Sequence, residues 1–305
     1  MGAFQEPLDL LVPTANDRHR SPLAKYHSWN AAPPAGAFVS IDSEYWLSDN
    51  KLCNIVVSSP EFCFLQMSQV LSDYELIELG FELCGNYAID PSAQRGMVGR
   101  PAVTTPKRLA VFCEKAQGMR GIKRAKRAVK WVIAGSRSPR ESRTAMIASM
   151  SRTCGGHGLP APLLNYEMIL PPHVARIVGA DKIYPDMYWR KLKTVLEYDS
   201  LDWHAGYEAA EHDARKRSAY RMLGLRVVSL TKSQFDEFDT VNSLFEDLAH
   251  GAHVVRGPAS ERQMRTRAAL HSYAVQGASR ERQTLPLLPE DLPVAPYEVE
   301  VEIPW

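Results

Sequence analysis

The sequence lacks the features that would place it among secreted, membrane or zinc-binding proteins. Its five cysteines, at positions 53, 63, 84, 113 and 154, are odd in number and include no CxxC pair. This pattern argues against a disulfide framework and is typical of thiols that serve as small apolar residues in a reducing compartment. No apolar run reaches the ~18 residues of a membrane span, and no basic segment opens the chain. We therefore expect a soluble, cytoplasmic protein.

The chain also lacks a charge excess and internal repeats. Lysine and arginine (36) almost balance aspartate and glutamate (35), so the net charge of +1 favours no polyanionic partner. Its 305 residues, 45% of them hydrophobic, are enough for two globular parts and a tail. We expect an N-terminal region of loops and helices over 1–135 that positions DNA or regulates, a second domain over 136–252, and a tail over 253–305 that is partly helical, then proline-rich and acidic.

Helix starts are strongly marked along the chain. Ser59 with Pro60, and Ser138 with Pro139, are predicted N-caps followed by proline at the first helical position. SDYE at 72–75 is predicted to be a capping box where two helices meet. Further helices are expected from residue 106 and over GIKRAKRAVKWVIAGS, which makes the N-terminal region mostly helical. SERQMRTRAALHSYAVQ in the tail is another candidate helix.

Residues 138–251 are predicted to form, in order, a helix, three strands, a helix, a strand and a helix. The strands are LLNYEMIL, YPDMYW, TVLEYD and, after a helix that ends at Gly224, LRVVSL. The short turn RKLK puts YPDMYW and TVLEYD on adjacent antiparallel strands, whereas the helix before LRVVSL allows a parallel pairing. This order predicts an α/β (α+β) fold with a mixed four-stranded sheet flanked by helices.

Carboxylates stand in two of these strands where a buried strand would carry apolar residues. Side chains alternate across a strand, so Glu197 and Asp199 share one face, and Asp186 on the neighbouring strand is expected beside them. Close carboxylates repel one another, which raises their pKa unless a cation neutralises them. A cluster of this kind predicts a site for a divalent cation, Mg²⁺ or Mn²⁺, that stabilises negative charge on a phosphoryl group.

The same stretch resembles a nuclease family. PD followed by E-x-D resembles the PD-(D/E)xK nuclease superfamily. EYDSLDWHAGYEAAEHDARKRSAYRMLGLRVVSLT is similar to the E-x-D-G-x-x-H, D-x-x-R and L-x-x-x-G-x-x-V elements of its very-short-patch-repair-like endonuclease domain. SPRESRTAMIA and GLPAPLLNYEM are similar to the helix and the strand entry that precede these elements in that family. The resemblance covers roughly 136–250 and implies a restriction-endonuclease-like core.

Carried over by position, the resemblance implies roles for individual residues. Asp186, Glu197 and Glu141 would be metal ligands, and Asp199 would stand where the wider superfamily has lysine. His204 would be a general base or a phosphate contact. With no lysine in that third place, activation of water would fall to the metal or to His204.

Two positions depart from the family pattern without deleting a metal ligand. Ser200 stands where glycine usually follows E-x-D, and Asp213 begins an element that has Lys216 where arginine is usual. The exchange keeps the charge but loses the bidentate geometry of arginine. His204, Asp213 and Lys216 could also be ordinary surface groups.

The acids have plainer interpretations as well. Glu197 and Asp199 could protect an edge strand from aggregation, Asp186 could serve a turn, and Glu141 could favour a helix N-terminus through the helix dipole. The aromatic residues of the stretch are read as core or rim residues rather than as base-stacking ones: Tyr188, Trp189 and Trp203.

The segment RGIKRAKRAVK, residues 120–130, has six basic residues among eleven positions. Ile122, Ala125, Val129 and Val132 form the apolar stripe of a predicted helix, whose basic face is either merely solvated or contacts phosphates. The predicted DNA contacts of this helix and of a later helix are Lys123, Arg124, Lys126, Arg127, Lys130, Arg215 and Lys216.

The sequence thus favours a metal-dependent DNA endonuclease that hydrolyses phosphodiester bonds. The alternative is a non-catalytic DNA-binding regulator of abortive-infection or toxin–antitoxin type on a decayed nuclease fold, and a protein-interaction module with structural acids is a third. The expected partner is DNA, joined by a second copy of the chain or by a toxin–antitoxin partner, and no membrane. Presence of all four acids favours the enzyme.

Overall fold

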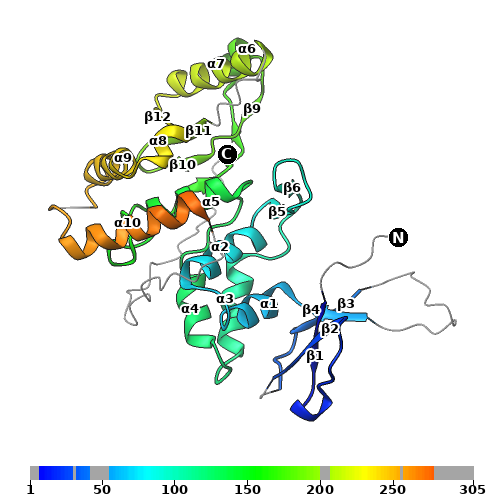
Figure 1. The fold of residues 1–305 in the computed structure, drawn as a ribbon. Helices are drawn as coiled ribbons and strands as arrows, with labels where there is room; N and C mark the ends of the chain where they lie inside the picture. Colours follow the sequence, from blue (N-terminus) through cyan, green and yellow to red (C-terminus); the bar gives the residue numbers. More distant parts are fainter. Residues whose placement is uncertain (1–6, 30–31, 42–54, 200–206, 255–256, 278–305) are drawn as a thin grey trace.

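The computed structural model describes residues 7–29, 32–41, 55–199, 207–254 and 257–277 (Figure 1). These ranges contain ten α-helices, two short 3₁₀ turns and twelve strands in five sheets. The helices are α1 (Pro60–Met67), α2 (Asp73–Leu83), α3 (Pro106–Lys115), α4 (Ile122–Val129), α5 (Pro139–Ser149), α6 (Pro172–Val178), α7 (Tyr207–Met222), α8 (Lys232–Asp236), α9 (Phe238–Gly251) and α10 (Glu261–Gln276). The strands are β1 (Leu8–Val12), β2 (Ala24–Ser28), β3 (Phe38–Ile41), β4 (Ile55–Ser58), β5 (Tyr87–Ile89), β6 (Met97–Gly99), β7 (Leu163–Leu164), β8 (Met168–Ile169), β9 (Lys182–Ile183), β10 (Met187–Trp189), β11 (Thr194–Asp199) and β12 (Arg226–Thr231).

A mixed four-stranded sheet in the order β12-β11-β10-β7 organises the second half of the chain. β10 is antiparallel to β11 and to β7, whereas β11 and β12 run parallel. The four-residue turn 190–193 holds β10 beside β11, and the crossover through α7 gives β12 its parallel direction. The predicted mixed α/β fold with a four-stranded sheet is confirmed.

The two faces of this sheet pack against different helices. Val195 belongs to an apolar cluster with α6 and α7, whereas the next residue, Leu196, belongs to a larger cluster with α5 and α9. Figure 1 shows α6 and α7 on one side of the sheet and α5 on the other. The predicted alternation along β11 therefore carries Glu197 towards α7 together with Val195.

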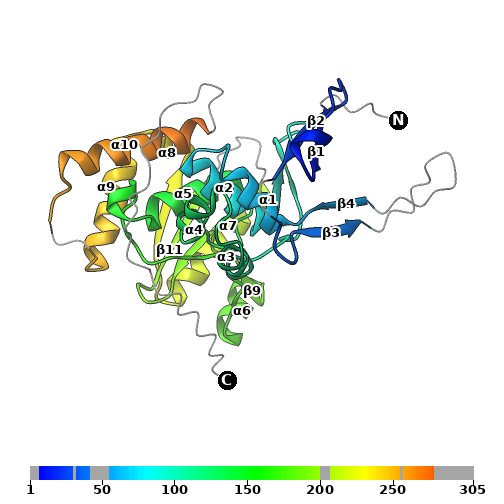
Figure 2. The ribbon, with the colours of Figure 1, turned by 90° about the horizontal axis from the view of Figure 1, so that it is seen from below.

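The predicted helix starts are confirmed in the first half of the chain. The Ser59 side chain accepts a hydrogen bond from the backbone amide of Phe62 at 3.2 Å, and Ser72 forms a reciprocal capping box with Glu75. α2 packs against α4 and α5, and in Figure 2 these helices lie together. One continuous apolar core accordingly runs from α1 through α5 to α10.

Several elements differ from the expectation. LLNYEMIL is not one strand, because Asn165 adopts a left-handed backbone (φ 48°) and turns the chain between β7, which joins the central sheet, and β8, which pairs with β9 instead. α6 and β9 lie between LLNYEMIL and YPDMYW, where no further helix or strand was expected, and the paired strands β5 and β6 lie in the N-terminal region expected to consist of loops and helices. The helix expected over 121–136 ends at Val129.

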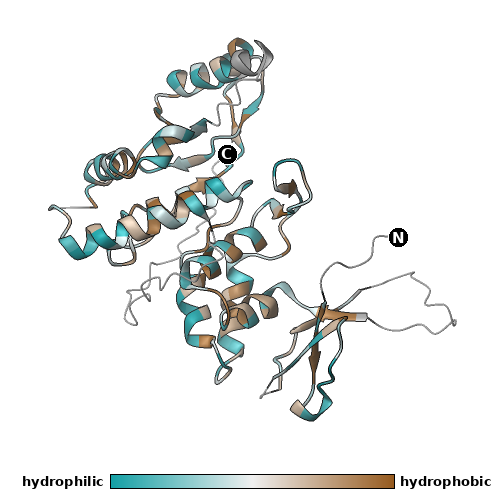
Figure 3. Ribbon diagram, viewed as in Figure 1, coloured by the Kyte–Doolittle hydropathy of each residue, from teal (hydrophilic) through white to brown (hydrophobic). Residues whose placement is uncertain are grey.

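The N-terminal region is less helical than expected, because β1 pairs with β2 in parallel. β3 and β4 pair in antiparallel fashion and lie in AGAFVSID and NIVVSS, whose residues favour short strands. In Figures 1 and 2 these strands project from the helices, and Figure 3 shows how apolar they are. Leu23 and Val56 are among the exposed apolar side chains there, at 77% and 57% exposed.

Helix α10 confirms the helix predicted in the tail, and it is an integral part of the body. Leu270, Tyr273 and Ala274 are buried in the main core, and Arg267 is 2% exposed. The tail prediction for the residues after 277 lies outside the described ranges. Within those ranges, no helix combines the length and the apolar character needed to cross a bilayer.

Candidate functional site

Asp186 directly precedes β10 and reaches across to the next strand. Its Oδ2 accepts a hydrogen bond from the backbone amide of Tyr198 at 2.8 Å, just beyond the end of the β10–β11 pairing. Because Met187 pairs with Leu196, the antiparallel register sets Asp186 opposite Glu197. The predicted placement of these two acids on adjacent strands is confirmed.

Glu197 lies under α7 and is held by two of its side chains. Lys216 Nζ donates to Glu197 Oε2 at 2.6 Å, and the Tyr220 hydroxyl donates to Oε1. The side chains of Glu197 and Lys216 are only 16% and 15% exposed. Lys216, predicted from the sequence as a DNA contact, is therefore a member of the acid cluster.

Glu141 belongs to the first turn of α5 and makes local hydrogen bonds. Its Oε1 accepts from Ser138 Oγ at 3.0 Å, and its Oε2 accepts from the Arg137 amide at 2.9 Å. Asn165 adds a third bond, from its side-chain Nδ2 to Glu141 Oε2 at 2.6 Å. The backbone amide of Asn165 donates to the backbone carbonyl of Asp186 at 3.1 Å. Glu141 thus stabilises the N-terminus of α5, as considered above. Through Asn165 its carboxylate is also connected to Asp186 at the start of β10.

Burial raises the pKa of all three carboxyl groups, and their charges act on one another. The pKa of Glu197 rises to about 7, first through burial and then through the charge of Asp186, which together outweigh Lys216. Burial and then Asp186 likewise raise the pKa of Glu141. The pKa of Asp186 itself is raised, mainly by burial. The charge of Asp186 therefore contributes to the raised pKa of both Glu141 and Glu197.

The other residues of the predicted active site have less defined surroundings. Asp199 ends β11, pairs with Thr231 of β12, and its charge helps to raise the pKa of Asp186. His204, Ser200 and Trp203 lie outside the described residues. Asp213 is half-buried and Arg215 exposed on α7, each with an interaction partner.

Basic side chains of helix α4 make more contacts within the protein than the sequence indicated. The Arg124 guanidinium donates to Asp73 at 2.9 Å and to the carbonyls of Ser68 and Leu71, both at 2.6 Å. Lys126 pairs with Glu114 at 2.7 Å. Of the five basic residues of α4 and its C-cap, Lys123 is the exposed one, whereas Arg124, Lys126, Arg127 and Lys130 are half-buried.

The apolar stripe predicted for this helix is confirmed, because Ala125, Val129 and Val132 are buried and Ile122 packs against the core. In Figure 1 the helix lies with α1 to α3, apart from α7. The predicted phosphate contacts of α4 stay a prediction, with Lys123 the residue whose exposure suits them best.

The acid cluster suits a hard divalent cation by the chemistry of its donors. Asp186, Glu197 and Glu141 offer carboxylate oxygens, the ligands that Mg²⁺ prefers. All three are half-buried, as is Lys216, which pairs with Glu197. Within the described ranges, no group of three His, Cys, Asp or Glu side chains stands ready to hold an ion. Mg²⁺ is commonly held by one or two carboxylates together with water and substrate phosphate, so that Asp186 and Glu197 can suffice as protein ligands.

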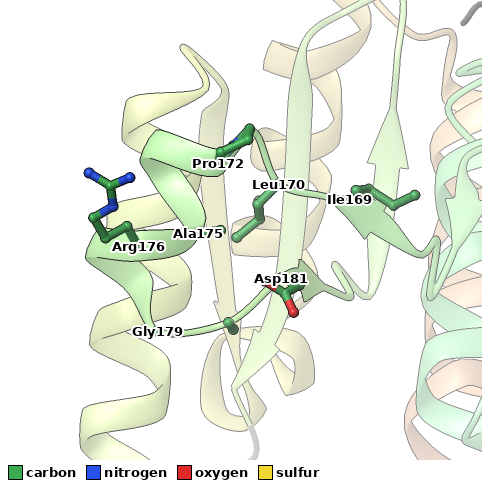
Figure 4. Close-up of a pocket in the computed structure, with 8 residues that line it drawn as sticks. Ile169, Leu170, Pro172, Ala175, Arg176, Gly179 and Asp181 are labelled. Atoms are coloured by element: carbon green, nitrogen blue, oxygen red, sulfur yellow. The ribbon is translucent and has the colours of Figure 1, made fainter.

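A hollow of about 530 Å³ lies away from these acids, around α6 (Figure 4). Leu170 points into it, whereas Arg176 points outward. It is lined by Ile169, Leu170, Pro172, Ala175, Arg176, Gly179, Ala180 and Asp181. None of the predicted site residues is among them.

The comparison of the chain with family models, curated proteins and solved structures gives no significant match to any of them. The function therefore has to be inferred from the site itself, together with the motif resemblance of residues 136–250.

Sequence reasoning missed Tyr220 and Asn165, and it gave Lys216 a different role. A signal was present for the pair on α7, because positions 216 and 220 are one helical turn apart and must share a face. Trp189 was read correctly, since it is 3% exposed and its ring nitrogen donates to the Pro160 carbonyl. Nothing in the local sequence pointed to Asn165, whose contacts join segments 24 and 30 residues away.

Proposed function

We propose that the chain is a metal-dependent endonuclease that hydrolyses phosphodiester bonds in DNA, on a core of the restriction-endonuclease-like type. The observation that carries this proposal is the half-buried pair of Asp186 and Glu197 beside Lys216, together with Glu141, whose pKa the charge of Asp186 helps to raise. Excess buried negative charge is costly to a fold. A cluster that keeps it is therefore more readily explained by a cation that arrives with the substrate.

Each residue has a distinct role in this proposal. Asp186 and Glu197 would hold Mg²⁺ or Mn²⁺, with Glu141 as the outer acid, and the ion when bound would stabilise negative charge on the scissile phosphate. Lys216 holds Glu197 in place and offers an ammonium group for a phosphate oxygen. Tyr220 fixes the second oxygen of Glu197, so that the carboxylate is oriented before substrate arrives.

One observation favours the alternative of a non-catalytic DNA-binding regulator. Both oxygens of Glu197 already have donors, Lys216 and Tyr220, so this carboxylate is satisfied within the protein. A nuclease fold that had lost its metal could be stabilised in this way. The two proposals agree on DNA as the partner and differ in hydrolysis and in metal binding.

The decisive experiment is cleavage of plasmid, duplex and mismatched DNA with Mg²⁺ or Mn²⁺ by the wild type and by Glu197→Gln. Glutamine keeps the shape of the side chain but removes its negative charge, and we expect cleavage to fall on the order of a thousandfold while DNA binding persists. His204→Ala should slow cleavage less, if that histidine assists as the motif implies.

The matched control is Glu114→Gln, which removes an exposed acid with a lysine partner of its own. It should leave cleavage and metal binding unchanged. If the wild type cleaves none of these substrates and calorimetric titration shows no binding of either ion at millimolar concentration, the regulator is the better proposal and the acids are structural.

A further inference from the structure

A surface rich in tyrosine and basic residues borders the acid cluster. Its rings are Tyr166, Tyr184 and Tyr188, and its cations are Arg137, Lys182 and Arg190; we call these six residues the tyrosine–cation surface. The cations are exposed and the tyrosines half-buried. It comes from four segments: the start of α5, the turn after β7, β9 with the residue that follows it, and β10 with its turn.

Cations lie over the rings of this surface. The Arg137 guanidinium carbon lies 5.0 Å from the centre of the Tyr184 ring, and that of Arg190 lies 5.5 Å from the Tyr166 ring. Tyr166 and Tyr188 contact each other with ring centres 5.9 Å apart. A guanidinium held over a ring presents a flat, charged plane, and unpaired nucleobases stack on arginine planes as well as on tyrosine rings.

The surface is held in place before any ligand binds. The Tyr184 hydroxyl donates to Glu167 Oε2 at 2.6 Å, and Lys182 pairs with the same oxygen at 2.8 Å. Arg190 donates to the Tyr166 hydroxyl at 3.0 Å. Three cations against the single carboxylate of Glu167 leave the surface positive, beside a cluster that is negative.

Backbone connections fix this surface beside the acids. Tyr184 is two residues before Asp186, and the charge of Arg137 lowers the pKa of Asp186 against the stronger effect of burial. Tyr166 follows Asn165, which donates hydrogen bonds both to Glu141 and to the Asp186 carbonyl. A strand that lies over these rings therefore brings a phosphate close to the acids.

We propose that the tyrosine–cation surface binds an unpaired nucleic-acid strand, with bases stacked on the rings and guanidinium planes and phosphates on the cations. The inference rests on the proposed function in taking nucleic acid as the ligand, and it adds that the substrate is single-stranded or opened beside the scissile phosphate. A continuous duplex offers its phosphates to the cations but keeps its bases stacked inside, away from the rings.

The test is fluorescence anisotropy in EDTA with a labelled 20-nucleotide DNA strand, the same strand as RNA, and the blunt DNA duplex. The wild type should bind the unpaired strand about tenfold more tightly than the duplex, and Tyr184→Ala should remove about that factor for the unpaired strand alone. In Tyr184→Ala the slope of log affinity against log salt concentration should stay unchanged, whereas Arg190→Ala should lower the magnitude of this slope by about 0.7. The DNA and RNA arms decide which strand is preferred.

Two control variants distinguish a loss of binding from a loss of folding. Tyr184→Phe keeps the ring and should bind as the wild type does. Arg226→Ala removes an exposed arginine of β12 that is paired with Asp247 and is not one of the six residues of the surface, and it should change nothing. Quenching of 2-aminopurine in the strand should report stacking directly and should be lost in Tyr184→Ala.

The inference fails if Tyr184→Ala, still folded by its thermal midpoint, binds the unpaired strand as the wild type does, or if the duplex binds equally well and no quenching occurs. The endonuclease proposal can fail separately. A protein that binds and stacks unpaired strands but cleaves nothing with Mg²⁺ or Mn²⁺ would keep this surface and lose the enzyme. A protein that cleaves duplex DNA without preferring unpaired strands would do the opposite.

Discussion

Carboxylates shielded wholly or in part from solvent occur in two contrasting arrangements in this protein. Among the helices of the first half of the chain, each of three buried acids has an arginine of its own, at 3.0 Å or less: Glu61 with Arg108, Asp73 with Arg124, and Glu78 with Arg143. At the sheet, by contrast, Glu141, Asp186 and Glu197 are half-buried, with Lys216 as the close cation of Glu197 and the charge of Arg137 acting on Asp186.

The difference indicates what each arrangement is for. A buried acid with its own arginine is neutralised within the fold, and it ties together helices that are distant in sequence. A half-buried group of three acids beside Lys216 and Arg137 keeps a net negative charge. The first arrangement stabilises the fold, and the second is the one on which the proposed metal site rests.

The largest effect is expected where a one-to-one pair is broken. Arg143 lies on α5 and Glu78 on α2, and the Tyr273 hydroxyl of α10 also donates to Glu78. Arg143→Met should lower the free energy of unfolding by about 3–5 kcal/mol, because it leaves the Glu78 charge buried without its cation. Urea unfolding measures this. The double variant with Glu78→Gln should recover part of the loss, and an additive loss would mean that the two side chains are not coupled.

A slightly smaller loss of stability is expected for Arg124→Met than for Arg143→Met, and almost none for the neighbouring Lys123→Met on α4. Arg124 binds Asp73 and two carbonyls, so Arg124→Met should cost about 3 kcal/mol, whereas Lys123→Met should change stability by less than about 0.5 kcal/mol. Thermal unfolding of both variants gives the comparison. Equal stability of the two would show that Arg124 is a surface group like Lys123, as the sequence alone suggested.

Neutralising an acid of the cluster should raise the free energy of unfolding at high pH, whereas the two arginine substitutions lower it. The pKa of Glu197 is about 7 in the folded chain, above the ordinary value of 4.5, so the folded state holds the proton more tightly. Stability from this group is full below about pH 4.5 and is lost as the pH rises to about 7, at a cost of about 3 kcal/mol at most. Glu197→Gln should therefore be as stable as the wild type at pH 4 and about 2 kcal/mol more stable at pH 8.

Urea unfolding at several pH values tests this sign, with Glu114→Gln as the control. Glu114 is 66% exposed, and its variant should follow the wild type at every pH. A Glu197→Gln variant that is less stable than the wild type at pH 8 would mean that the pair with Lys216 outweighs burial.

The smallest effect is that of the ion on stability. Mg²⁺ at about ten times its dissociation constant should raise the free energy of unfolding by about 1.4 kcal/mol at pH 8, because it binds the folded state alone. The rise should vanish in Glu197→Gln and persist in Glu114→Gln. Thermal unfolding with and without Mg²⁺ measures it, and an equal rise in all three proteins would indicate non-specific screening.

Local features of the chain were predictable because their causes are local. The caps at Ser59, Ser72 and Ser138 depend on groups three residues away, and the β10–β11 pairing depends on a four-residue turn. The split of LLNYEMIL was not predictable from apolar pattern, because one residue in a left-handed conformation sends its two halves into different sheets.

The sequence by itself determined the helix starts, the mixed sheet, and the meeting of Asp186 with Glu197, since periodicity and short turns fix which side chains share a face. Only the tertiary structure decided which cation each acid meets. Lys216 and Arg124, both predicted as DNA contacts, pair with Glu197 and Asp73, which are 19 and 51 residues away in the sequence. Long basic side chains have many rotamers, and packing between distant elements, rather than local pattern, selects the partner that each one reaches.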